Sequence, residues 1–243
     1  MSLHLYGVVS ADTELPRGLV GRADADVRTV SDQRLGVLVS DIEDDARVGR
    51  SDLLAHAHAL EQVAETCTVI PIQFGMLMPD EETVRRELLG ARGDRTTALL
   101  HAFEGFIQLT VTARYDEDAA LREIVRRDPG LRARPAEDPM DTQAKMRLGE
   151  AIAAALEELR NEDGELVLQR LAPHARAVAL NEVRDAYTAT SLALLVARSA
   201  RAGLDRAVAD LRRELARCDI RYVGPQPPYA FLESVDTEAS SWA

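Results

Sequence analysis

The clearest pattern along the chain lies in the segment 106–115 (FIQLTVTARY), where apolar and polar side chains alternate strictly from Ile107 to Tyr115. A strand points successive side chains to opposite faces of its sheet, so Ile107, Val111 and Tyr115 share one face. Gln108 and Thr112 share the other face. One apolar and one polar face is typical of antiparallel sheets. We therefore predict a half-buried antiparallel strand at this position.

The hydrophobic spacing after this strand predicts a further series of helices and strands. We expect a helix over residues 116–127 and then a long helix that ends near Arg160, closed by the turn Asn161–Gly164. Two further helices are expected, over residues 165–171 and around Leu204–Leu215. Strands are expected over residues 176–183, 189–197 and 219–223. The resulting order is β–α–(α)–β–β–α–β. This order is typical of a ferredoxin-like domain.

The first hundred residues have a different order. We predict strands over residues 3–9, 27–30 and 34–42, the last two joined as a hairpin around Asp32, and helices over 51–65, 79–89 and 94–103. Ser51 is the expected N-cap of the first helix, and Leu53, Ala57, Leu60 and Ala64 are expected to face the sheet. Because no helix separates the first strands, a doubly wound nucleotide-binding fold is excluded.

The stretch Thr68–Gly75 (TVIPIQFG) lies between two of these helices. Its apolar, β-branched residues predict a strand over residues 68–72. Pro71 has no N–H to donate, so this strand should lie at a sheet edge or end early. Phe74 and Gly75 are expected to be a buried ring and a turn.

The two halves together predict an α+β protein. The predicted domains are an N-terminal α+β domain over residues 1–104, a ferredoxin-like α+β domain over 105–223, and a C-terminal extension with a polar tail over 224–243. A length of 243 residues is sufficient for both domains to bury a core.

Composition limits the classes of partner. The net charge of −12 disfavours a general affinity for nucleic acid or for an anionic lipid membrane. An aromatic content of 4% disfavours a stacking platform for single-stranded nucleic acid. The N-terminus has no basic, apolar leader, and no apolar run approaches the roughly 18–20 residues that cross a bilayer. We therefore expect a cytoplasmic protein.

Motifs that carry chemistry are missing. The sequence contains no P-loop, GxGxxG, GxSxG, HExxH or CxxC pattern. His56 and His58 lie two positions apart on a predicted helix and point about 200° away from each other, so they cannot share a metal. His4, His101 and His174 have no companions in the sequence that would form a relay. We expect no catalytic, metal-binding or cofactor-binding residues, which favours an interaction protein over an enzyme.

Several stretches, taken in order, resemble the GvpF/GvpL family of gas vesicle proteins over essentially the whole chain to Glu233. They are LYGVV at 5–9, LLAH at 53–56 leading to LE at 60–61, TVIPIQFG at 68–75, LGE at 148–150, LLV at 194–196 and GPQPPYAF at 224–231. No single motif is decisive, but their order and spacing are specific. The chain departs from the family pattern at Gln73, where Arg is usual, and at Gln226, where Trp is usual.

The resemblance implies a non-enzymatic accessory or minor structural protein of the gas vesicle, without a cofactor. Its implied partners are the hydrophobic shell protein and other gas vesicle accessory proteins, and it would assist nucleation or assembly. The resemblance also implies two α+β domains. The family-motif residues, whose expected role is structural, are His56, Pro71, Phe74, Gly75, Gly224, Pro225, Pro227, Pro228 and Tyr229.

Two further expectations concern the arrangement of these motifs. Residues 224–231 are rich in proline, which favours an extended segment, and we predict that they pack on the first domain near Phe74. The alternative function is a small-molecule-binding regulator with a ligand cleft between the two domains. His56, Gln73 and Arg114 are the candidate polar groups for that cleft.

Overall fold

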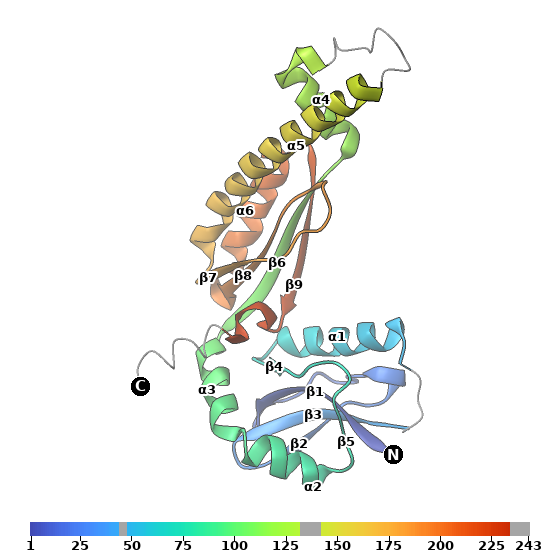
Figure 1. Ribbon diagram of the computed structural model, residues 1–243. Helices are drawn as coiled ribbons and strands as arrows, with labels where there is room; N and C mark the ends of the chain where they lie inside the picture. The colour runs from blue at the N-terminus through green and yellow to red at the C-terminus, as the bar shows by residue number, and fades with distance from the viewer. Residues whose placement is uncertain (44–47, 132–141, 234–243) are drawn as a thin grey trace. The chain divides into compact units, whose positions relative to one another are not determined.

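The structure is a computed structural model that describes residues 1–43, 48–131 and 142–233 (Figure 1). Its contacts divide the chain into two compact units. Unit 1 comprises Met1–Leu109, Leu195–Arg198 and residues 224–233, and unit 2 comprises Thr110–Leu194 and Ser199–Val223. Each unit combines helices with antiparallel strands, as the α+β prediction requires. The predicted domain boundary at residue 104 remains a proposal.

The sheet of unit 1 is built around a long central strand. Its strands are β1 (Ser2–Ser10), β2 (Arg28–Ser31), β3 (Leu35–Ile42), β4 (Ile70–Pro71) and β5 (Leu77–Met78). The order is β2-β3-β1-β4, and β5 also pairs with β1. β2 and β3 are antiparallel with Thr29 opposite Leu38, so the predicted hairpin is confirmed.

Helix α1 (Arg50–Ala64) covers one face of this sheet (Figure 1). Leu60 and Val63 pack with Tyr6 and Leu38, which point from β1 and β3 to the same side. The expected inner face was partly wrong, because Leu53 is 49% exposed. The expected cap was also wrong: the N-cap is Gly49, whose N–H donates to Asp52.

The opposite face of the sheet is covered by the short helices that follow. These are α2 (Glu81–Val84), the π-helical turn η2 (Arg85–Gly90) and α3 (Gly93–Phe103). Val84 and Leu88 pack against Leu5, Val37 and Val39. The alternation of Val37, Leu38 and Val39 between two apolar cores explains why β3 reads as a continuous hydrophobic run.

The edge position predicted for Pro71 is confirmed. β4 is the last strand in the order and pairs with β1, with Pro71 opposite Gly7. The strand is shorter than predicted, two residues instead of five, because Pro71 has no N–H to continue a ladder. Ile72 then donates its N–H to the Tyr6 carbonyl at 2.8 Å, which holds the following residues against β1.

The second sheet contains β6 (Phe106–Tyr115), β7 (Ala177–Leu180), β8 (Thr188–Ala197) and β9 (Cys218–Gln226), in the order β7-β8-β6-β9. The N–H of Tyr115 donates to Tyr187 O, and that of Asp116 to Arg217 O, so β8 and β9 run antiparallel to β6. The element order matches the prediction. The ferredoxin-like assignment itself remains a prediction.

Three helices accompany the sheet of unit 2: α4 (Glu117–Arg127), α5 (Thr142–Leu171) and α6 (Arg201–Glu214) (Figure 1). The predicted break at Asn161–Gly164 was wrong, since α5 is one helix of 30 residues. A Cβ on Gly164 would lie 3.4 Å from the Ala189 carbonyl oxygen. This glycine therefore permits a close approach of helix and strand instead of ending the helix.

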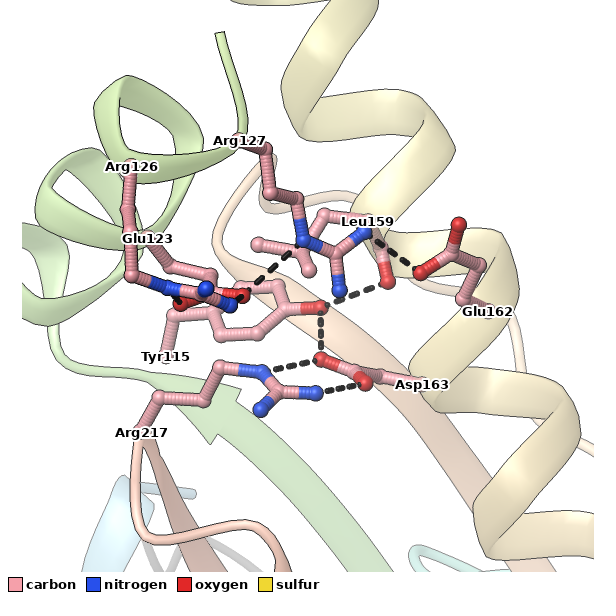
Figure 2. Close-up of polar contacts among 8 residues, drawn as sticks. All are labelled: Tyr115, Glu123, Arg126, Arg127, Leu159, Glu162, Asp163 and Arg217. Carbon is pink, nitrogen blue, oxygen red and sulfur yellow. Dashed lines mark hydrogen bonds and ion pairs between the residues drawn. The ribbon is translucent and has the colours of Figure 1, made fainter. Parts of the chain in front are cut away.

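A polar cluster in unit 2 explains why Asp163 is buried inside α5 (Figure 2). The carboxylate accepts from Tyr115 Oη at 2.8 Å and, through both oxygens, from the Arg217 guanidinium. Two causes raise the pKa of Tyr115 above its ordinary value: burial is the larger, and the hydrogen bond to Asp163 is the next. Arg127, which is also drawn in Figure 2, donates to Glu123 of α4 and to Glu162 of α5. These contacts join α4, α5 and β6.

Candidate docking groove

A groove of about 750 Å³ opens on unit 1 between α1 and two motif segments. Helix α1 contributes Leu53, His56, Ala57 and Glu61; the segment after β4 contributes Pro71, Ile72, Gln73 and Phe74; the C-terminal segment contributes Gln226, Tyr229, Leu232 and Glu233. Three segments that are far apart in the sequence therefore form one concave surface.

Backbone chemistry places Phe74 in this groove. Pro71 ends β4, and Gly75 then turns the chain with φ +91°, a conformation that side chains with a Cβ rarely adopt. The Phe74 ring packs edge-on against His56, with ring centroids 5.4 Å apart, and against His4 at 5.6 Å. Pro71 thus ends the strand and Gly75 turns the chain, as the sequence predicted, whereas the ring of Phe74 was expected to be buried and is only partly buried because it lines the groove.

The wall behind the groove contains a buried pair of histidines. His4 Nε2 and His56 Nδ1 lie 3.1 Å apart, and Tyr6 stacks on the His56 ring with centroids 5.1 Å apart. Burial is the largest cause that lowers both histidine pKa values, and the pKa of His4 falls to about 4. Both rings are therefore neutral at pH 7. The sequence analysis expected no relay partner for His4 and did not foresee that it pairs with His56.

The tautomers of this pair follow from their other contacts. The hydrogen bond between His56 and the Ile72 backbone raises the His56 pKa, so the ring donates to it. His56 Nδ1 must then accept, and His4 Nε2 is the donor. Within the described residues, His4 Nδ1 has no hydrogen-bond partner. The pair is thus a packed wall and offers no free donor to the groove.

A buried arginine holds the start of α1 against the sheet. Arg22 is 3% exposed, and its Nε donates to Asp52 Oδ1 at 2.8 Å. Its backbone N–H donates to Tyr6 Oη, and that hydroxyl lies 2.8 Å from Ser40 Oγ. Polar groups on β1, β3 and α1 are therefore paired below the groove. Sequence reasoning missed this arrangement because the partners lie 16 to 34 positions apart.

The C-terminal segment forms the remaining wall, as predicted. Pro225, Pro227 and Pro228 are buried, and the Ala230 N–H donates to Gln108 Oε1 at 2.9 Å. Tyr229 remains 44% exposed and lines the groove together with Phe74. Two causes raise the pKa of Tyr229 to about 12: burial is the larger, and the negative charge of Glu61 is the smaller. Its hydroxyl therefore remains protonated at neutral pH.

The model of the family "Gas vesicle synthesis protein GvpL/GvpF" matches residues 2–233, which include every segment of this groove. The chain belongs to the GvpL/GvpF family.

Individual relatives agree with this assignment. The chain is 30% identical over 240 residues to gas vesicle protein F of Streptomyces sp. (strain CB03234), covering 96% of this chain and 100% of that protein. It is 27% identical over 238 residues to gas vesicle protein F1 of Halobacterium salinarum, covering 96% and 93%. These alignments span both units.

Solved structures show the same fold. The crystal structure of GvpF from Anabaena sp. PCC7120 matches with a TM-score of 0.78 at 20% identity, covering 95% of this chain and 98% of that one. The crystal structure of GvpF from Microcystis aeruginosa matches with a TM-score of 0.73 at 20% identity over the same shares. At this level of identity the likeness concerns the fold.

The two departures from the family pattern meet in this GvpL/GvpF protein. Gln73 and Gln226 both line the groove although they are 153 positions apart. His56 and Gln73, candidates for the alternative ligand cleft, are thus brought together in unit 1. Arg114 is not among the residues that line this groove, and its Nε donates to Asp185 Oδ2 in unit 2.

Across residues 1–43, 48–131 and 142–233, no group of three or more His, Cys, Asp or Glu side chains could hold a metal ion. None of the helices among these residues is long and apolar enough to span a bilayer. The functional role of the nine family-motif residues remains a prediction.

Proposed function

We propose that this protein is a non-enzymatic accessory or minor structural protein of the gas vesicle that binds the hydrophobic shell protein and assists nucleation and assembly. Membership of the GvpL/GvpF family supports a role in gas vesicle formation. The shell protein is the partner that the family resemblance implies. Other gas vesicle accessory proteins are further partners, and the protein acts in the cytoplasm at the vesicle.

The observation that carries this proposal is the groove built from the family's own motif segments. Its surface is largely apolar, and Leu53 and Tyr229 remain 49% and 44% exposed within it. A contiguous apolar hollow on a protein surface is typical of a binding site for a protein or an apolar ligand. An apolar segment of the shell protein would be covered there and removed from water.

The negative net charge of the protein also supports binding of the shell protein. A shell subunit before assembly exposes apolar surface and strand edges, which favours aggregation. A partner with a net charge of −12 would add charge to the complex and keep it dispersed. The same charge disfavours nucleic acid and anionic lipid membranes as partners. The protein would therefore deliver the shell subunit to the growing vesicle.

Deletion and complementation in the native host test this function. Loss or malformation of gas vesicles without a metabolic defect is expected on deletion, and the wild-type chain should restore them. Leu53→Glu should fail to restore them because it places a carboxylate in the groove. Leu54→Glu is the matched control, since Leu54 is 58% exposed on the same helix but does not line the groove. Normal vesicles in the deletion strain would overturn the proposal.

A further inference from the structure

Among the described residues that line the groove, the only groups charged at neutral pH are carboxylates. Glu61 lies on α1 and Glu233 at the end of the C-terminal segment, and no Lys or Arg is among the twelve lining residues. His56 adds no positive charge, because burial keeps its pKa low and the ring neutral. Arg22, behind the wall, is paired with Asp52. The groove therefore has an apolar surface with acidic positions.

We infer that the segment that fills this groove combines large apolar side chains with a basic residue placed opposite Glu61. This inference rests on the proposed function and specifies the chemistry of the partner at the same site. It excludes an entirely apolar occupant and an acidic one.

The apolar part of the inference follows from the side chains that remain to be covered. Leu53, Ala57, Ile72 and Leu232 present aliphatic surface, and Phe74 and Tyr229 present rings. Covering them with apolar side chains releases water from both surfaces, which is the main driving force of association. The neutral amide of Gln73 can hydrogen-bond the partner's backbone without requiring a countercharge.

The basic part follows from Glu61. This side chain is half-buried and lines the groove together with Tyr229, so it lies inside the groove and not on a distant rim. An apolar occupant would remove water from the carboxylate and leave it unpaired, which is costly. A guanidinium or ammonium group on the occupant offsets that cost and favours the correct register.

Fluorescence anisotropy of short labelled peptides on the full chain tests the inference. Three peptides share one apolar sequence and carry Arg, Gln or Glu at a single position. The Arg peptide should bind the wild-type protein about tenfold more tightly than the Glu peptide. Glu61→Arg should reverse this order, and Glu61→Gln should remove most of the difference. Leu53→Glu should weaken all three peptides, whereas Leu54→Glu should not.

Equal affinities of the three peptides, or an order that Glu61→Arg leaves unchanged, would overturn the inference. Circular dichroism of each variant establishes that it is folded. A parallel capture of the shell protein separates the two levels of the argument. Capture of the shell protein without charge discrimination among the peptides would refute the inference and leave the proposed function standing. Charge discrimination without capture would refute the proposed function and support the assigned chemistry of the groove.

Discussion

His4 Nε2 lies 3.1 Å from His56 Nδ1, and both rings are buried behind the groove of unit 1. The rings contact Tyr6 and Phe74, and the charged groups that act on His4 are Arg22 and Asp52. The pair joins the central strand to α1 without using a charge. Its neutrality makes the stability of unit 1 sensitive to acid.

We predict that the free energy of unfolding falls as the pH drops from about 6.5 to about 4. The folded-state pKa of His4 is about 4 and its unfolded value is 6.5, so the unfolded chain binds more protons in this window. The contribution of neutral His4 to the free energy of unfolding is fully present above this pH window. It is lost as the pH falls to the lower end of the window, which lowers the free energy of unfolding by roughly 2–3 kcal/mol. Urea unfolding at a series of pH values measures this slope.

Two variants show whether the slope belongs to this pair. His4→Phe should reduce the loss of stability between pH 6.5 and 4, even though it lowers stability at pH 7. His101→Gln should keep the wild-type slope, because the His101 side chain is 75% exposed. A His4→Phe profile as steep as that of the wild type would contradict the assignment.

The buried cluster of Figure 2 predicts a second stability effect. Asp163→Ala leaves the Arg217 guanidinium and the Tyr115 hydroxyl without their shared acceptor, so unit 2 should lose about 2–4 kcal/mol. Tyr115→Phe removes a single donor and should cost about 1 kcal/mol. Asp210→Asn, in an exposed pair with Arg213, should cost less than about 0.5 kcal/mol. Chemical denaturation followed by circular dichroism would rank the three variants, and equal losses would refute this account.

Arg198 stabilises the C-terminal end of α1. Its Nη atoms donate to the carbonyls of Ala64 and Glu65, which the helix end leaves unpaired, and to the carbonyl of Cys67 just beyond the helix, all at 2.7–2.8 Å. Arg198→Met should therefore destabilise unit 1 by about 1.5–3 kcal/mol, and Arg198→Lys should recover only part of this. Hydrogen exchange of the α1 amides is the measurement. Exchange rates unchanged in Arg198→Met would show that the cap contributes nothing.

Two glycines of the family motifs should respond differently to alanine. Gly75 has φ +91° with nothing near its Cβ position, so Gly75→Ala should cost about 1 kcal/mol in strain alone. Gly224 has φ +132°, and a Cβ there would lie 2.7 Å from Leu109 Cδ2 and 2.9 Å from Gln108 O. Gly224→Ala should therefore cost about 2–4 kcal/mol and loosen the C-terminal wall of the groove. Thermal denaturation of both variants would compare them, and equal shifts would contradict the packing argument.

The elements that sequence reasoning predicted well are those with strong local periodicity. β6 and α4 match their predicted ranges because their apolar spacing is unambiguous. Gly164 was misread because a glycine that ends a helix and one that admits a neighbouring strand look alike in the sequence. Leu53 was wrongly expected to face the sheet, because the side chain lines the groove instead.

The groove itself could be predicted only in part. The segments around Phe74 and Tyr229 were expected to meet, because prolines limit where each chain can go. The pairing of His4 with His56 and of Arg22 with Asp52 carried no local signal, since each pair is joined only by the folded sheet and α1. The acidic character at Glu61 was equally hidden, because an isolated glutamate on a helix is usually solvated.

Co-expression with the shell protein tests the central claim most directly. The measured quantity is the fraction of shell protein that stays in solution and co-purifies with the wild-type chain, with Leu53→Glu or with Leu54→Glu. We predict that the wild type and Leu54→Glu retain the shell protein and that Leu53→Glu loses it. Retention by Leu53→Glu equal to that by Leu54→Glu would contradict the assignment of the groove as the docking site.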